Sequence, residues 1–338
     1  MKIQLSEHFT YKKMIQFVLP SIVMMIFTSI YGVIDGLFVS NFVGKTAFAA
    51  INLIMPLLMG LSALGFMIGT GGSAIVSKAL GEGKRELANQ YFSMLVYVSV
   101  LGGIILAVSG MFLLRPIAIL LGATGELVEL CVLYGRILLV SLTAFLLQNV
   151  FQSFFVTAEK PQLGLKVTVA AGLANIVLDY LFIAVFHWGI TGAAVATAIS
   201  EFIGGLFPIF YFSRRNESLL RLVKARLDIR ALGRACANGS SELMTNLSLS
   251  VVNSLYNLQL ISIAGENGVA AYGTIMYVNF IFIAIFLGYS IGSAPIIGYH
   301  YGAGNQGELK NLLRMSLSMV GVCGVVLMLL AEVLAAPL

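Results

Sequence analysis

The apolar stretch 163–186 carries two polar side chains where a membrane-spanning helix ordinarily carries none. Asn175 and Asp179 are four residues apart, so they share one helical face. An ionisable group inside a bilayer costs several kcal/mol unless it is paired, neutralised or hydrated. Asp179 is therefore predicted to be functional. The structural alternative is a carboxylate that pairs with a basic neighbour and holds two helices together.

Several other polar side chains are expected at a similar depth, near the outer ends of their helices. Asp35 shares a face with Tyr31, one turn earlier, and Thr197 and Glu201 are likewise one turn apart. Together with the first pair they predict a hydrated cluster. The alternatives are an Asp35 that faces water and a Thr197 that bonds only to its own backbone. Carboxylate, amide and hydroxyl oxygens suit sodium, and carboxylates also carry protons, so the cluster fits either ion.

Arg136 lies within the apolar stretch 127–156, at a depth close to that of these acidic residues. A guanidinium at that depth needs a partner, and we expect this partner to be Glu201. The alternative is an Arg136 side chain that extends outward to the membrane surface.

The composition is that of a polytopic membrane protein. Of the 338 residues, 59% are hydrophobic and 10% are charged, and the mean hydropathy is +0.96. The apolar runs are about 20 residues long and lack the alternation of barrel strands, which indicates an all-α fold. No nucleophile–base pair or metal motif occurs, so neither an enzyme nor a cofactor is expected. Nine helices are expected, at about 14–40, 47–77, 89–114, 127–156, 162–186, 192–213, 236–263, 269–299 and 311–335.

The basic residues predict the orientation in the membrane. With a cytoplasmic N-terminus, 17 of the 20 Lys and Arg residues face the cytoplasm, in accord with the positive-inside rule. Seven of them lie in 214–234, which is predicted to be a cytoplasmic linker. Because the net charge of +5 is gathered on one side of the membrane, no nucleic-acid partner is implied.

The chain repeats itself after 221 residues: Gly71 aligns with Gly292, and Gly81 with Gly302. A repeat with an even number of helices enters the membrane twice from the same side, which predicts two parallel lobes across a cavity. The second lobe is expected to be incomplete, because the chain is either a fragment or a truncated product. The predicted division is an N-terminal lobe of six transmembrane helices (1–213), the linker (214–234) and a partial C-terminal lobe of three (235–338).

Five motifs occur in a specific order along the chain. They are Tyr31-Gly-Val-Ile-Asp35, Gly81-Glu-Gly83, Asn175-Ile-Val-Leu-Asp179, Gly189-Ile-Thr-Gly192-Ala-Ala-Val-Ala and Gly302-Ala-Gly304-Asn305. In this order they resemble the multidrug and toxic compound extrusion (MATE) family, twelve-helix antiporters of the wider group that includes lipid-linked sugar flippases. The resemblance covers the whole chain and about three quarters of a family member, so it implies about nine of twelve helices.

The resemblance also implies a cation site in the N-terminal lobe. Its ligands would be Asp35, Asn175, Asp179 and Thr197, which would hold sodium if the coupling ion is sodium and protons otherwise. The residues expected to support this site or to line a substrate path are Tyr31, Arg136, Glu201, Glu242 and Asn246.

Glu242 and Asn246 begin a polar face on the predicted helix 236–263. Glu242 is followed along roughly one face by Asn246, Asn253 and Asn257. We expect the face to line the path of the substrate. The alternative is that Glu242 lies at the membrane surface and caps the start of the helix.

The function implied is a cation-coupled multidrug efflux antiporter, which exports amphipathic, often cationic compounds by alternating access. We expect a monomer that crosses a prokaryotic cell membrane many times, with small molecules and the lipid bilayer as its partners. One alternative is a lipid-linked oligosaccharide flippase, which would need several basic residues in its cavity, where only Arg136 is found. Others are a membrane receptor or scaffold, or a truncated protein that does not transport.

Overall fold

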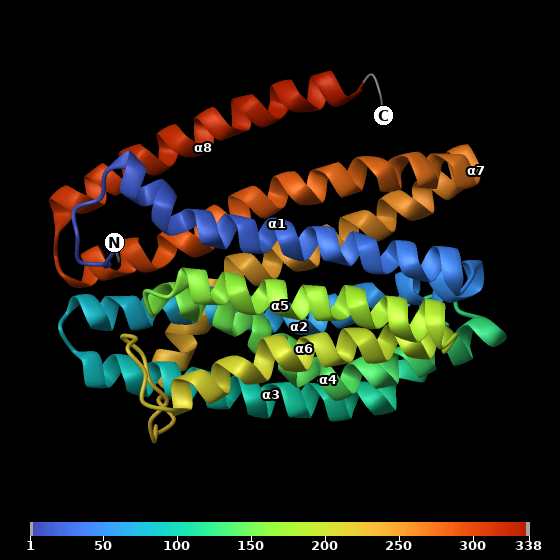
Figure 1. The fold of residues 1–338 in the computed structure, drawn as a ribbon, viewed down its shortest axis with the longest axis horizontal. Coiled ribbons are helices and arrows are strands. Elements are labelled where there is room, and N and C mark those ends of the chain that lie inside the picture. Colours follow the sequence, from blue (N-terminus) through green and yellow to red (C-terminus); the bar gives the residue numbers. More distant parts are fainter. Residues whose placement is uncertain (1–2, 336–338) are drawn as a thin grey trace.

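The computed structural model describes the backbone of residues 3–335, which is helical apart from turns, the N-terminal residues and one long connection. Side chains are described in the same range except at position 45, at most positions from 250 to 278, and at 334–335. The helices are α1 (Tyr11–Phe42), α2 (Lys45–Gly81), α3 (Arg85–Leu120), α4 (Glu126–Thr157), α5 (Pro161–Asp179), the π-helix η1 (Tyr180–Val185), α6 (Gly189–Ser213), α7 (Ile229–Gly302) and α8 (Gln306–Ala335) (Figure 1).

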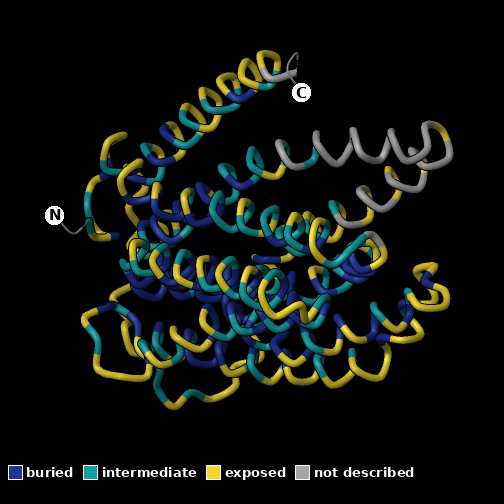
Figure 2. Tube along the Cα trace, turned by 45° about the vertical axis from the view of Figure 1, so that its right-hand side comes forward, coloured by how far each residue is buried: buried dark blue, intermediate teal, exposed yellow. Residues whose placement is uncertain are grey.

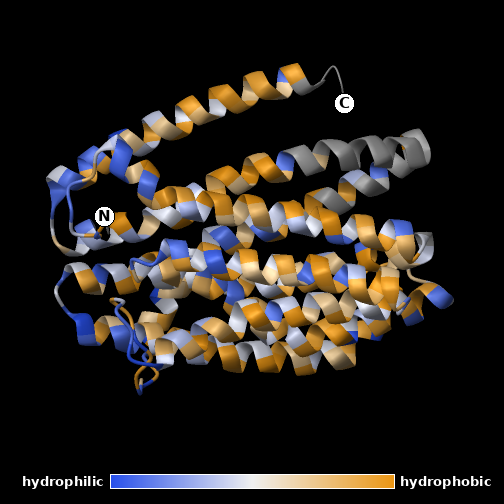
Figure 3. Ribbon diagram, viewed as in Figure 1, coloured by the Kyte–Doolittle hydropathy of each residue, from blue (hydrophilic) through white to orange (hydrophobic). Residues whose placement is uncertain are grey.

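The helices are long enough and apolar enough for a membrane. Eight segments of the described chain could cross a bilayer by length and composition. With 37 residues, α2 is about 56 Å long and exceeds a hydrocarbon core of about 30 Å. Hydrophilic residues gather at the two ends of the bundle and apolar residues lie between them (Figure 3). The all-α membrane fold expected from the composition is confirmed.

Helix α7 differs from the prediction, because it is helical through the break expected at 264–268. A straight helix of its 74 residues would be about 111 Å long. Both of its ends nevertheless contact α2, because a side chain added at Gly71 would meet the backbone of Ala235, and one added at Gly81 would meet that of Tyr299. Thus α7 folds back on itself, and its two limbs are the seventh and eighth predicted helices (Figure 1).

The core of the N-terminal half is built around α4. Of its 32 residues 22 are buried, because α2, α3 and α6 pack around it. Small residues permit this close approach: the backbone of Gly205 in α6 lies against that of Ala144 in α4. The outer helices α3 and α8 expose many apolar side chains, as expected of surfaces that face lipid (Figure 2).

One end of the bundle carries the N-terminal segment, the α2–α3, α4–α5 and α7–α8 turns, and the α6–α7 connection; we call it the basic end. The N-terminal segment contacts the α4–α5 turn and the first turn of α8. The backbone N–H of Leu5 donates to Glu159 Oε1 (2.7 Å), and that of Phe9 donates to Glu308 Oε1 (2.9 Å). The first residues therefore bridge the α4–α5 turn and the start of α8.

The α6–α7 connection lies along α3. The backbone N–H of Arg221 donates to Asn89 Oδ1 (2.9 Å), and that of Val223 donates to Ser93 Oγ (2.8 Å). Tyr97 Oη in turn donates to the carbonyl of Val223 (3.1 Å). The three α3 residues follow one another at four-residue intervals, so they form one face of that helix.

The connection is shorter than the linker predicted at 214–234. Asp228 caps the start of α7, since its Oδ1 accepts from the backbone N–H groups of Arg230 and Ala231 (3.0 Å each). The last residues of the predicted linker are therefore helical, and the non-helical connection ends at Asp228.

Candidate functional site

The structure gathers the predicted acidic residues in the interior of the N-terminal half. Asp35 comes from α1, Asp179 from α5 and Glu201 from α6, and each is at most 8% exposed. The carboxyls of Asp35 and Asp179 are close enough to act on each other electrostatically. The convergence expected from depth alone is therefore present for Asp35 and Asp179.

The packing of α1 against α5 brings Asp35 and Asp179 together. Gly172 has no side chain, and an atom added there would lie 2.9 Å from Cδ1 of Tyr31. The two helices run in the same direction from the basic end, so one turn beyond this contact Asp35 and Asn175 follow on their respective helices. Asn175 is 1% exposed and continues the polar face toward Asp179.

The helix type changes directly after Asp179. Residues 180–185 form the π-helix η1, where the sequence predicted one continuous helix over 162–186. The backbone N–H of Phe186 ends this segment by donating to the carbonyl of Leu181 (2.8 Å). Single π turns inside α-helices are frequent at functional sites. Asp179 thus lies at the junction between two helix types.

Unsatisfied polar atoms mark the centre of the cluster. Both carboxylate oxygens of Asp179, Oδ1 of Asp35, Nδ2 of Asn175 and Oγ1 of Thr197 are buried without a hydrogen-bond partner among the described residues. A buried polar group without a partner costs about 1–3 kcal/mol, and a charged one more. The cluster can therefore accept a proton or a small cation.

Tyr134 belongs to the cluster and was missed by the sequence analysis. Its side chain is fully buried in α4 and acts electrostatically on Asp35, Asp179 and Glu201. Its hydroxyl lies beside that of Thr197, but neither makes a hydrogen bond of normal geometry.

A signal for Tyr134 was present in the sequence. Tyr134, Ser141 and Gln148 follow one another at seven-residue intervals, so they lie on one face of α4, and all three are buried. Gln148 in turn lies beside the side chain of Tyr31, which connects this face to α1.

The expected pair between Arg136 and Glu201 is wrong. Glu201 accepts a hydrogen bond from Ser141 Oγ (2.5 Å), whereas Arg136 is exposed. Side chains two positions apart on a helix point in directions that differ by about 200°. Arg136 therefore faces away from the side of α4 that carries Tyr134. Arg136 lies along α4 between Tyr134 and Ser141, but the helical angle turns it away from the cluster. Whether its side chain extends to the membrane surface stays a prediction.

The polar face predicted on α7 lies partly outside the described residues. Glu242 and Asn246 are half-buried, and Asn246 Nδ2 donates to the backbone carbonyl of Glu242 (2.8 Å). The side chains of Asn253 and Asn257 lie outside the described set. Their part in a substrate path stays a prediction.

The donor set suits a light monovalent ion or a proton. No group of three or more His, Cys, Asp or Glu residues capable of holding a metal occurs among the described residues. Among the described residues, no basic side chain is an electrostatic neighbour of the three carboxyls. Two carboxylates with amide and hydroxyl oxygens would neutralise and coordinate sodium, or share a proton.

Comparison with known proteins agrees with this architecture. The family model MatE matches residues 20–181 and 243–338. The multidrug export protein MepA of Staphylococcus haemolyticus is 29% identical over 317 residues, which are 94% of this chain and 70% of that protein. The MepA of Staphylococcus aureus is 26% identical over 320 residues, again 94% of this chain and 70% of that protein.

Solved structures share the fold. An outward-facing multidrug resistance MATE family transporter of the MOP superfamily matches with a TM-score of 0.89 and 23% identity, over 97% of this chain and 73% of that one. A MOP superfamily transporter from Pyrococcus furiosus matches with a TM-score of 0.88 and 24% identity, over 96% of this chain and 72% of that one. The helical bundle predicted from the sequence is thereby confirmed.

Proposed function

The chain belongs to the MatE family, and we propose that it is a cation-coupled exporter of small amphipathic compounds. The observation that carries this proposal is the pair of Asp35 and Asp179. Both are buried and face each other, and no basic side chain in the described part of the chain is among their electrostatic neighbours. Two such carboxylates repel each other unless a proton or a cation neutralises them. Binding of that ion is the event that can be coupled to transport.

The remaining polar residues complete the ion site. Asn175 and Thr197 would supply neutral oxygens, and the hydroxyl of Tyr134 lies where it can supply another. With sodium as the coupling ion these groups act as ligands. With protons the Asp35–Asp179 pair itself carries the charge.

The proposed cycle follows from this site. Cations enter from outside, neutralise Asp35 and Asp179, and favour a rearranged N-terminal half from which the substrate leaves outward. The emptied halves then rock back and take up substrate from the cytoplasm. Binding can drive these steps only because the ion has different affinities for the two states. One charge that crosses the membrane contributes about 2.3 kcal/mol per 100 mV.

The substrate class and the setting are part of the proposal. The MepA relatives are named as multidrug export proteins, which favours amphipathic, often cationic substrates. The basic end would face the cytoplasm of a prokaryotic cell, in accord with its Lys and Arg content. The protein would act as a monomer, without enzymatic chemistry and without a cofactor other than its coupling ion.

Export of a fluorescent cationic dye from everted membrane vesicles that contain the protein tests this proposal. A sodium gradient and a pH gradient are applied separately. Ion-dependent flux that is lost in Asp35→Asn and in Asp179→Asn, while membrane insertion is unchanged, is the expected result. Glu129→Gln is the matched control, because this carboxylate is exposed and pairs with Arg115 away from the cluster. It should retain full export.

The same assay separates the alternatives. Unchanged export in Asp179→Asn would overturn the site assignment. No dye flux under either gradient would favour a flippase or a protein that does not transport. The cluster itself argues against a flippase, since Arg136 is turned outward and leaves no described basic group beside the three carboxyls.

A further inference from the structure

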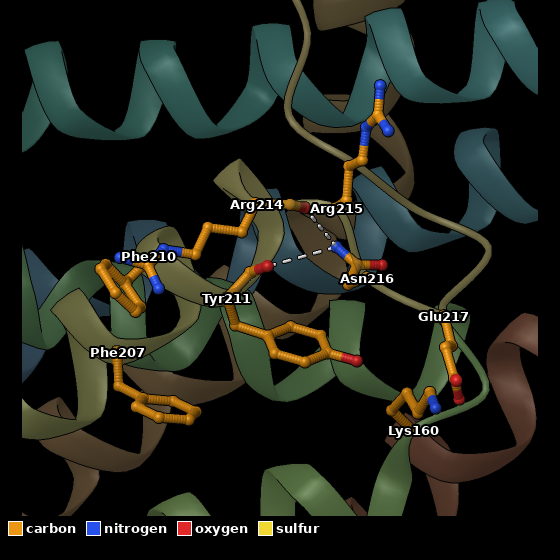
Figure 4. Close-up of a pocket in the computed structure, with 8 residues that line it drawn as sticks. All are labelled: Lys160, Phe207, Phe210, Tyr211, Arg214, Arg215, Asn216 and Glu217. Atoms are coloured by element: carbon orange, nitrogen blue, oxygen red, sulfur yellow. Dashed lines mark hydrogen bonds between the residues drawn. The ribbon is translucent and has the colours of Figure 1, made fainter.

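A cleft of about 410 Å³ lies at the basic end of α6, away from the buried carboxyls. It is formed by the last turns of α6, the first residues of the α6–α7 connection and Lys160 at the start of α5 (Figure 4). Ser213 ends both α6 and its candidate membrane span, so we expect the cleft at the level of lipid headgroups.

The cleft is positively charged. Lys160, Arg214 and Arg215 line it together with the carboxylate of Glu217, which gives three positive charges against one negative. Arg214 and Arg215 are exposed, and neither takes part in the ion pairs found among the described residues. An anion is therefore the ligand that the charges favour.

Arg214 is held in position by an aromatic ring. Its guanidinium carbon lies 3.8 Å from the centroid of the Phe210 ring. This stacking occupies the face of the guanidinium and leaves the N–H groups of its edge for an acceptor such as a phosphate oxygen. The side chains of Arg214 and Phe210 can be followed in Figure 4.

The wall of the cleft is fixed by hydrogen bonds. Asn216 Nδ2 donates to the backbone carbonyls of Tyr211 and Arg214 (3.2 Å each), and its Oδ1 accepts from the Ser218 hydroxyl (2.6 Å). Ser218 is buried, and its backbone carbonyl accepts from Arg85 Nη2 (3.0 Å), which holds the start of the connection against α3. These bonds therefore hold the backbone of the turn that carries Arg214 and Arg215.

An apolar stripe leads from the cleft along α6. Ile203, Leu206, Phe207 and Phe210 are exposed and follow the spacing i, i+3, i+4, i+7, so they form one face. Phe210 belongs both to this stripe and to the stacked pair with Arg214. The apolar surface is thus continuous with the positive charge. A phospholipid would contact both, with its headgroup at the charge and an acyl chain on the stripe, whereas a free phosphate ion would contact only the charge.

We propose that this cleft binds an anionic glycerophospholipid. The headgroup phosphate lies against Arg214 and Arg215, and an acyl chain lies on the α6 stripe. A net positive charge at the headgroup level selects anionic over zwitterionic lipids, because each basic residue near the surface contributes about 1 kcal/mol of attraction.

Native mass spectrometry of the purified protein in detergent micelles tests this assignment. Phosphatidylglycerol is compared with phosphatidylcholine, and soluble glycerol phosphate is offered as a competitor. The double variant Arg214→Gln/Arg215→Gln should bind phosphatidylglycerol roughly 30-fold more weakly, the loss expected for two basic residues. Arg221→Gln/Lys224→Gln is the matched control, because it removes the same charge from the connection outside the cleft. It should bind like the unchanged protein.

Phe210→Leu keeps the charge and the apolar surface but removes the stacked ring, so phosphatidylglycerol binding should weaken several-fold. This single substitution at an exposed position also keeps the test decisive if the double variant fails to fold. Equal binding of the two lipids, or an equal loss in the control variant, would overturn the proposal. Displacement of the lipid by soluble glycerol phosphate at matched concentration would assign the cleft to a free phosphate compound instead.

Discussion

Replacing Tyr134 by Phe removes one hydroxyl from the middle of the buried cluster and leaves the packing of α4 unchanged. That hydroxyl is fully buried and makes no hydrogen bond of normal geometry in the described structure. Its removal should therefore leave the free energy of unfolding unchanged or raise it, because an unsatisfied buried hydroxyl costs about 1–3 kcal/mol. Stability and function are expected to respond differently.

The expected effect on function comes from the neighbours of the hydroxyl. It faces Asp35, Asp179 and Glu201, so an ion bound there would gain an oxygen ligand or a hydrogen-bond donor from Tyr134. A hydrogen bond to a charged group contributes about 1.5–3 kcal/mol. The ion concentration that half-saturates export should rise about 10- to 150-fold, since 1.4 kcal/mol corresponds to a factor of ten.

Two measurements on each variant check this expectation. Dye export in everted vesicles is recorded against the concentration of the coupling ion, and thermal unfolding is recorded in detergent. Tyr289→Phe serves as the control, because its hydroxyl donates to Ser316 Oγ (2.8 Å) outside the cluster. This control should lose about 0.5–1.5 kcal/mol of stability and keep its ion dependence.

The reasoning would be refuted if Tyr134→Phe became more stable while its ion dependence stayed the same. The hydroxyl would then be only a poorly satisfied packing group. Loss of stability beyond that of the Tyr289→Phe control would show instead that the hydroxyl has a structural partner.

Two further predictions concern the helix crossings and the turns. Gly71→Val should prevent normal folding or expression, because any side chain there meets the backbone of Ala235. Gly102 has open space around it, so Gly102→Ala should be neutral or should stabilise the protein by up to about 1 kcal/mol. Thermal unfolding measures the stability of both variants. The hydrogen bond that Lys84 donates to Glu82 (2.8 Å) lowers the pKa of Glu82. The stability that this pair contributes is therefore fully present above the usual carboxyl pKa and is lost as the pH falls through the lowered pKa. In Lys84→Met, the pKa of Glu82 measured by NMR titration should rise toward its ordinary value.

Sequence patterns predicted the elements of the fold well, because long apolar runs broken by charged turns leave few choices in a membrane. The spacing of Asn175 and Asp179 placed both on one face, and depth brought Asp35 to the same level. The two apolar runs at 236–263 and 269–299 predicted that α7 folds back on itself. They did not predict that the chain stays helical between the two runs. The π-helix after Asp179 was not predictable, since its residues are ordinary apolar ones.

Errors in the candidate site have one physical origin. Depth along a helix can be counted from its ends, but the direction of a side chain depends on how the helix is rotated against its neighbours. Arg136 was therefore placed at the right level and on the wrong side. Tyr134 was missed for the complementary reason, because an aromatic residue within an apolar helix is distinguished only by the polar residues that share its face at 141 and 148.

The way the α6–α7 connection is held has a consequence for how this segment changes during evolution. The contacts with Asn89, Ser93 and Tyr97 use the backbone of Arg221 and Val223 and not their side chains. Substitutions in the connection can therefore alter its charge without detaching it from α3. Among homologues, the three α3 positions should vary slowly while the connection drifts freely, and selection on its basic side chains would act only where they have a ligand of their own.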